Sequence, residues 1–276
     1  MTDITDRRLV HLPPAAGRLG HVLGRPKVLA AACVVALTTL GWLYLGLAAT
    51  GEGAPHGIGV LCGPLPRAAI GISGLAFALC MWIAMAFAMM LPSAGPMIFT
   101  YAEIADTAAC KGEAIVSPFV LAAGYALVWI VFSLVATILQ TGLTQVGALN
   151  DNTAMTSTVL SGAVLVAAGF YQFSAFKHAC LHKCRHPFPF FFANWQTTPA
   201  GVFRLGVVQG LYCLGCCWAM MSVMFAVGAM NLIWMAALGT AMTVEKMLTG
   251  RRFSHALGLS LLGAGAIVVV LALQQG

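Results

Sequence analysis

Long apolar runs separated by short polar segments make up most of this chain. Each run has about 20 residues, which is the length that an α-helix needs to cross the hydrocarbon core of a bilayer. Continuous apolar runs favour helices over a membrane barrel, whose strands alternate between apolar and polar residues. We therefore expect seven transmembrane helices, at approximately 27–50, 69–91, 115–139, 155–176, 203–226, 229–248 and 255–274.

The composition supports a membrane protein. Only 8% of the 276 residues are charged and 60% are hydrophobic, whereas a soluble domain carries about 25% charged residues. The first apolar run has no A-x-A-like cleavage site, so we interpret it as a span and not as a removed signal peptide. The sequence predicts an all-α polytopic bundle, with a basic N-terminal arm at 1–26 and one transmembrane domain at 27–276.

The distribution of basic residues predicts the orientation. If the N-terminus lies inside, Arg67 is the one basic residue, of 14 Lys and Arg, that falls in an outer segment. Because cytoplasmic loops carry an excess of Lys and Arg, we expect a cytoplasmic N-terminus and an outer C-terminus. The net charge of +6 follows from this topology and requires no nucleic-acid partner.

The fifth apolar run carries the most informative side chains. At 100° per residue, three cysteines and two methionines fall within about 100° of one another. Thiols and thioethers are soft ligands that select Cu(I), so this face is a candidate metal site close to the membrane midplane. The candidate ligands are Cys213, Cys216, Cys217, Met220 and Met224.

The same run offers an alternative interpretation. Gly206 and Gly210 form a small-residue pair, and small residues line helix contacts in membranes. The cysteines and methionines could then fill a packing seam. The sequence alone leaves both interpretations open.

The second run carries a methionine stripe at Met81, Met85 and Met89, spaced i, i+4 and i+8 on one helix face. These thioethers are candidate weak relay sites for a soft ion, and ordinary packing is the alternative. Pro92 and Pro96 follow, and we expect them to end this helix on the inner side. A short interfacial helix would then carry the segment 99–111.

The inner segment after the fourth run holds a second cluster of possible ligands. His178, His182 and His186 are spaced at i, i+4 and i+8, and Cys180 and Cys184 would lie nearly opposite if the segment is helical. An unwound loop would mix the two sets. We interpret Cys180 and Cys184 as a cytoplasmic donor or acceptor pair, with His178 and His182 as further metal ligands.

Two other features of this region allow simpler readings. The basic residues of the segment, Lys177 among them, could anchor the span to lipid headgroups. Glu245 and Lys246, near the inner end of the sixth run, are ionisable residues within a span, but they lie close enough to its edge to reach the interface.

Several enzyme signatures are missing. The chain has no G-x-x-x-x-G-K-[ST], G-x-S-x-G, H-E-x-x-H or C-x-x-C-H motif. Cys213 and Cys216 form a C-x-x-C pair, but a thiol buried in hydrocarbon is poorly reactive. A dithiol oxidoreductase is therefore a disfavoured alternative, and a role other than catalysis is favoured.

Four motifs resemble an uncharacterised bacterial family described as predicted metal-binding integral membrane proteins. The resemblance covers about residues 80–270. It implies a multi-pass protein of the bacterial cytoplasmic membrane with a metal site that includes the cysteines but not the three histidines. The segments that carry it are 82–97, then Tyr171-Gln172 with Lys177, Cys180-Leu181, Cys184-Arg185 and Pro187, then 210–218, and 230–236 with Glu245-Lys246.

The leading hypothesis is a membrane protein that binds a soft transition metal for transport or for delivery to a partner. Cu(I) is favoured and Zn(II) is possible. The expected partners are the lipid bilayer, the metal ion, and a metallochaperone or membrane complex. The alternatives are a membrane thiol-redox protein that passes electrons to a quinone, and a structural subunit of a larger membrane complex.

Overall fold

The computed structural model describes residues 26–50, 72–110, 115–150, 154–228 and 231–275, and the described chain is almost wholly helical. It has no β-strand among these residues, apart from an isolated bridge between Leu149 and Met155. The all-α prediction is confirmed, while most of the N-terminal arm and Arg67 lie outside the described residues. The helices are α2 (Pro26–Thr50), α4 (Ile72–Cys110), α5 (Pro118–Gln145), α6 (Thr158–Tyr171), α7 (Ala175–Arg185), α8 (Pro187–Ala193), α9 (Pro199–Val227), α10 (Leu232–Met247) and α11 (Arg252–Gln275).

Four helices in the described part of the chain are long and apolar enough to cross a membrane, namely α4, α5, α9 and α11. The number rises to five if α6 and α7, which bend by 65° at the break between them, form one broken span. The helices α2 and α10 are shorter as apolar segments: α2 offers Ala31–Leu47, and α10 has 16 residues. The expected count of seven spans therefore remains a prediction.

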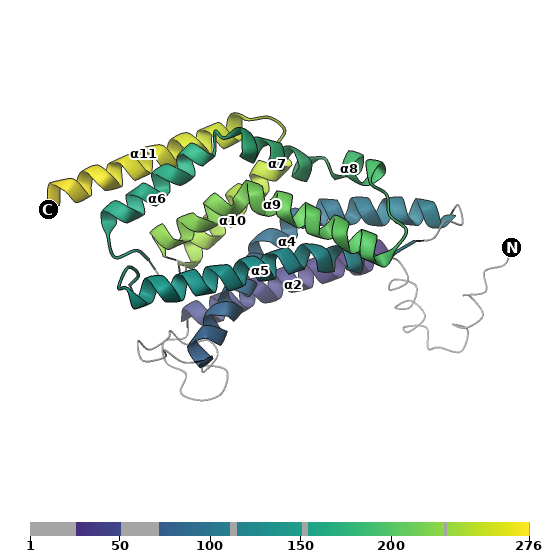
Figure 1. Cartoon of the computed structure of the whole chain (residues 1–276), viewed down its shortest axis with the longest axis horizontal. Helices are drawn as coiled ribbons and strands as arrows, with labels where there is room; N and C mark the ends of the chain where they lie inside the picture. Colours follow the sequence, from purple (N-terminus) through teal and green to yellow (C-terminus); the bar gives the residue numbers. More distant parts are fainter. Residues whose placement is uncertain (1–25, 51–71, 111–114, 151–153, 229–230, 276) are drawn as a thin grey trace.

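The helix α9 lies in the middle of the bundle (Figure 1). It packs against α5, α6, α7 and α10, while α2 packs on α4 and α11 packs on α6. The buried core runs between these helices and includes Trp82, Trp129 and Tyr101. This arrangement places the cysteine face of α9 inside the protein and away from lipid.

The prediction that Pro92 and Pro96 end the second helix is wrong, because α4 continues through both prolines to Cys110. Proline lacks an N–H, so Pro92 leaves the carbonyl of Ala88 without its usual helical partner. The indole N–H of Trp42 on α2 donates to this carbonyl at 3.2 Å. Neighbouring side chains that satisfy freed carbonyls allow proline inside membrane helices. The local sequence around Pro92 does not indicate that Trp42, on another helix, supplies this hydrogen bond.

The segment after the fourth run is a second helix and not an unwound loop. The helix α6 ends at Tyr171, and Ser174 caps α7 by accepting a hydrogen bond from the N–H of Lys177 at 3.1 Å. This cap starts a new helix in a new direction. As a result α7 crosses back over α9, with one face against that helix and another facing outward.

Glycines bring α5 and α9 into close contact. A methyl group at Gly206 would lie 2.1 Å from the carbonyl oxygen of Leu121, and one at Gly124 would lie 2.2 Å from that of Phe203. Only glycine permits this backbone approach. The predicted packing seam therefore exists, but Gly206 and Gly210 meet α5, and the cysteine cluster lies further along α9.

A candidate metal centre between α7, α9 and α10

Cys213 lies at the centre of a buried polar cluster. Its sulfur is 3.0 Å from the ammonium nitrogen of Lys246 on α10 and 3.0 Å from the hydroxyl oxygen of Tyr125 on α5. Its side chain is 3% exposed. A thiolate at this position would accept two hydrogen bonds, one of them from a full positive charge.

Three more thiols surround Cys213. The sulfur of Cys216 lies 3.3 Å from that of Cys217, and the Cys216 thiol donates to the carbonyl oxygen of Cys213 at 3.1 Å. The side chain of Cys184, which projects from α7, interacts with the thiols of Cys213 and Cys216. Four thiols from two helices therefore meet in one place, although Cys184 is 29 positions before Cys213 in the chain.

Lys246 connects the thiols to α4. Its ammonium nitrogen lies 2.8 Å from the hydroxyl oxygen of Ser93 and 3.8 Å from the thioether sulfur of Met90. The Ser93 hydroxyl in turn donates to the Met90 carbonyl at 2.8 Å. The ammonium group thus has a polar shell of sulfur and oxygen atoms inside the bundle, and it is not extended toward an interface.

A buried ion pair lies next to this cluster on α10. The ammonium of Lys177 on α7 pairs with the carboxylate of Glu245 and also donates to the side-chain oxygen of Gln172. Lys177 is fully buried and Glu245 is 2% exposed. Because both side chains are buried and paired with each other, the structure does not support the interpretation that Lys177 and Glu245 reach the membrane interface.

The donor atoms are soft, but they are not arranged around an open position. Within the described residues, no group of three or more His, Cys, Asp or Glu side chains has the arrangement of a metal site. The 3.3 Å between the sulfurs of Cys216 and Cys217 is shorter than the roughly 3.8 Å that separates two thiolates on one tetrahedral zinc with bonds of 2.3 Å. The structure therefore has hydrogen-bonded thiols that must separate slightly to hold an ion.

The methionines of the two predicted stripes are all buried, but the structure does not bring the two stripes together as one set of ligands. Met220 and Met224 share the interior face of α9 with the cysteines. Met89 on α4 faces α10, where its side chain approaches Gly239. The helices α4 and α9 approach each other through the rings of Trp82 and Phe225, whose centroids are 5.3 Å apart.

For the remaining stripe positions, Met81 and Met85, metal ligation stays a prediction. The thioether that contacts the ammonium of Lys246 is that of Met90, which does not belong to the predicted stripe of Met81, Met85 and Met89. In the sequence, only the position of Met90 next to the Leu91-Pro92-Ser93 segment could have indicated that it lies near the site.

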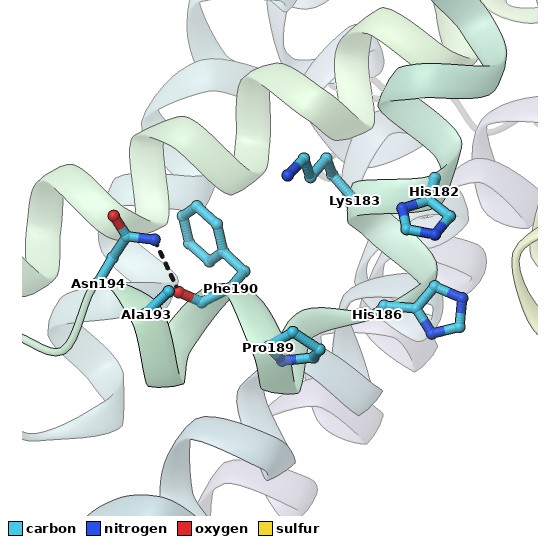
Figure 2. A pocket seen from close by; sticks show the side chains of 7 residues that line it. All are labelled: His182, Lys183, His186, Pro189, Phe190, Ala193 and Asn194. Carbon is cyan, nitrogen blue, oxygen red and sulfur yellow. Dashed lines mark hydrogen bonds between the residues drawn. The ribbon is translucent and has the colours of Figure 1, made fainter.

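The other predicted ligands of α7 divide between two faces. Cys180 packs against Gly215 of α9, where an added methyl group would lie 2.7 Å from its sulfur. The ring of His178 meets that of His255 at a centroid distance of 5.7 Å. The rings of His182 and His186 lie 4.8 Å apart and line an open pocket (Figure 2).

Comparison with known protein families identifies the family of this chain. A family model described as "PpoB2: Copper chaperone" matches residues 79–268, which is more than half of the chain. The matched range contains every residue of the thiol cluster and its partners. Comparisons with curated proteins and with solved structures found no match.

Proposed function

The chain belongs to this copper chaperone family, and on that premise we propose that it binds Cu(I) as cargo at the thiol cluster and passes it to a partner. The cluster consists of Cys184, Cys213, Cys216 and Cys217. The observation that carries the proposal is the convergence of these four thiols in one place, where the sulfur of Cys213 contacts the ammonium group of Lys246.

The chemistry of the donors favours Cu(I) over harder ions. Thiolates and thioethers are the soft ligands that select Cu(I), and the cluster has four thiols with Met90 beside them. Harder divalent ions prefer carboxylate oxygens, and no carboxylate of the described residues contributes to the cluster. The buried carboxylate of Glu245 is already paired with Lys177.

The charge balance is also suitable. Cu(I) held by two thiolates carries a net charge of −1, and a net charge inside the bundle is costly unless it is paired. The ammonium of Lys246 supplies the compensating +1 at 3.0 Å from the Cys213 sulfur. Cysteine binds Cu(I) as a thiolate. Each thiol that is protonated before the ion arrives must therefore release its proton, so the binding of Cu(I) is coupled to proton release.

Cys184 is suited to the exchange of the ion. It is the one partly exposed thiol of the cluster, whereas the three on α9 are buried. Ligand exchange at Cys184 would move the ion between a partner and the interior without exposing the other thiols. The partner would be a metallochaperone or a copper-requiring membrane complex.

Cu(I) stoichiometry and affinity of the purified protein in detergent test this proposal. Anaerobic titration against a chromogenic Cu(I) chelator should give one tightly held ion for the wild type and a loss of at least 100-fold in affinity for a variant with Cys213, Cys216 and Cys217 changed to Ser. The variant keeps Cys184 as the one thiol of the cluster, so even if only two thiolates bind the ion, at least one of them is lost and a two-thiolate site can no longer form.

The matched control is Cys80→Ser, because Cys80 is exposed on α4 and lies outside the cluster. This variant should bind as the wild type does. If the triple variant keeps the wild-type affinity and stoichiometry, the proposal is wrong. A disulfide between Cys213 and Cys216 in protein purified without reductant would instead favour the thiol-redox alternative.

A further inference from the structure

Two adjoining pockets open beside α7, α8 and the beginning of α9. The first has a volume of about 370 Å³ and the second about 430 Å³, and they share Lys183, Phe190 and Asn194 as a common wall. Cavities of this size can hold a small molecule or a headgroup. Neither pocket contains a residue of the thiol cluster, so they are separate from the proposed copper site.

Apart from the phenol of Tyr212, the ionisable side chains that line the pockets are basic or imidazole groups. His182, Lys183 and His186 line the first, and Lys183 and Arg204 line the second. No Asp or Glu in the described part of the chain lines either pocket. Such a lining disfavours a cation and favours an anion, and a guanidinium is suited to binding two oxygens of a phosphate at once.

The side chains are arranged around the cavity in a way that suits a shared anion. In Figure 2 the side chain of Lys183 extends from α7 across the opening toward Phe190 of α8, while the rings of His182 and His186 lie to one side. The Asn194 amide donates to the Phe190 carbonyl at 2.9 Å, which holds the far wall in place. Lys183 can therefore reach an anion in either pocket.

The short helix α8 indicates where such an anion would come from. Phe188 is 56% exposed and Phe192 is 76% exposed, and their rings stack at a centroid distance of 6.2 Å. Phe191, on the opposite face, is fully buried against Tyr101. Aromatic side chains are enriched where a membrane meets water, so the exposed pair is suited to lie among acyl chains at headgroup level.

We propose that these pockets bind the phosphodiester of an anionic phospholipid, with Lys183 and Arg204 on the phosphate and Phe188 and Phe192 against the acyl chains. Basic pockets at the membrane surface attract anionic headgroups. The same phosphate chemistry could be supplied by free inorganic phosphate. The exposed pair Phe188 and Phe192 favours the lipid, because apolar rings can contact acyl chains but add nothing to the binding of a soluble phosphate ion.

The test uses the full chain in nanodiscs of phosphatidylcholine, titrated with a fluorescent phosphatidylglycerol. Wild-type protein should bind this lipid, and a variant with Lys183→Gln and Arg204→Gln should bind it at least tenfold more weakly. A variant with Arg251→Gln and Arg252→Gln, which removes the same charge from exposed residues elsewhere, should bind as the wild type does. A variant with Lys183→Arg and Arg204→Lys, which keeps both charges, should retain most of the binding.

A second arm separates the two sources of phosphate. Inorganic phosphate at millimolar concentration should not displace the lipid. If it does, or if the Lys183→Gln, Arg204→Gln variant binds the lipid as tightly as the wild type, the lipid site is refuted. Cu(I) affinity, measured in parallel, should be unchanged in this variant, so a failure of the copper proposal and a failure of the lipid proposal give different results.

Discussion

At the scale of single residues, one ammonium group organises the candidate site. Lys246 on α10 contacts Cys213 on α9 and both Ser93 and Met90 on α4, so it connects sulfur and oxygen atoms of two other helices. A buried charge persists only where it is paired and hydrogen-bonded. The cluster is therefore best described as a paired ammonium and sulfur, with three further thiols around it.

We predict that Lys246→Gln weakens Cu(I) binding by about 10- to 100-fold, because a hydrogen bond to a charged group contributes about 1.5–3 kcal/mol. Chelator competition on the purified protein measures this. Lys183→Gln removes a lysine charge outside the cluster and should leave the Cu(I) affinity unchanged. An equal affinity for wild type and Lys246→Gln would show that the ammonium does not balance the charge of the bound ion.

At the scale of helices, the course of α4 depends on a neighbour. Pro92 removes a helical hydrogen bond, and the Trp42 indole on α2 occupies the carbonyl that is left. Ser93, one residue later, then reaches Lys246. The proline turn, which looks like a helix end in the sequence, instead places a hydroxyl group beside the candidate site.

We predict that Trp42→Phe lowers the free energy of unfolding by about 1 kcal/mol or more, since it leaves a buried carbonyl unpaired. Pro92→Ala supplies an N–H to the same carbonyl, so the loss should shrink when both changes are combined. Thermal unfolding in detergent of the two single variants and the double variant gives the coupling energy. Strict additivity of the two changes would contradict the capping role of Trp42.

At the scale of the whole molecule, α10 ties the bundle together through two neighbouring residues. Glu245 pairs with Lys177 of α7, and Lys246 contacts α9 and α4. The guanidinium of Arg185 adds hydrogen bonds to the backbone carbonyls of Glu245, at 3.1 and 2.6 Å, and of Gly250. The end of α10 is thus held from two sides, which keeps Lys246 in register with the thiols.

We predict that Lys177→Met destabilises the protein by about 3–5 kcal/mol, because it leaves the Glu245 carboxylate buried without its partner. The combination of Lys177→Met with Glu245→Met removes both charges and should recover most of the stability. Unfolding midpoints of the three proteins, measured in the same detergent, check this. A double variant as unstable as the single one would show that packing and not charge pairing explains the loss.

The sequence by itself determined the all-helical class, the approximate position of most helices, and the face of α9 that carries Cys213, Cys216 and Cys217. These features depend on local periodicity, which decides which side of its own helix a residue occupies. Local periodicity does not fix the number of membrane spans. In the described residues, the apolar part of α2 and the whole of α10 are shorter than the helices that are long enough to cross a membrane.

Only the tertiary structure decided which helices face one another. Cys184, Tyr125 and Lys246 come to Cys213 from three other helices, and nothing in local spacing indicates a contact between residues so far apart in the chain. It also decided that α4 continues through its prolines, since the compensating hydrogen bond comes from another helix. The physical reason is the same in both cases: periodicity orients a side chain about its own axis, while packing between helices selects its partner.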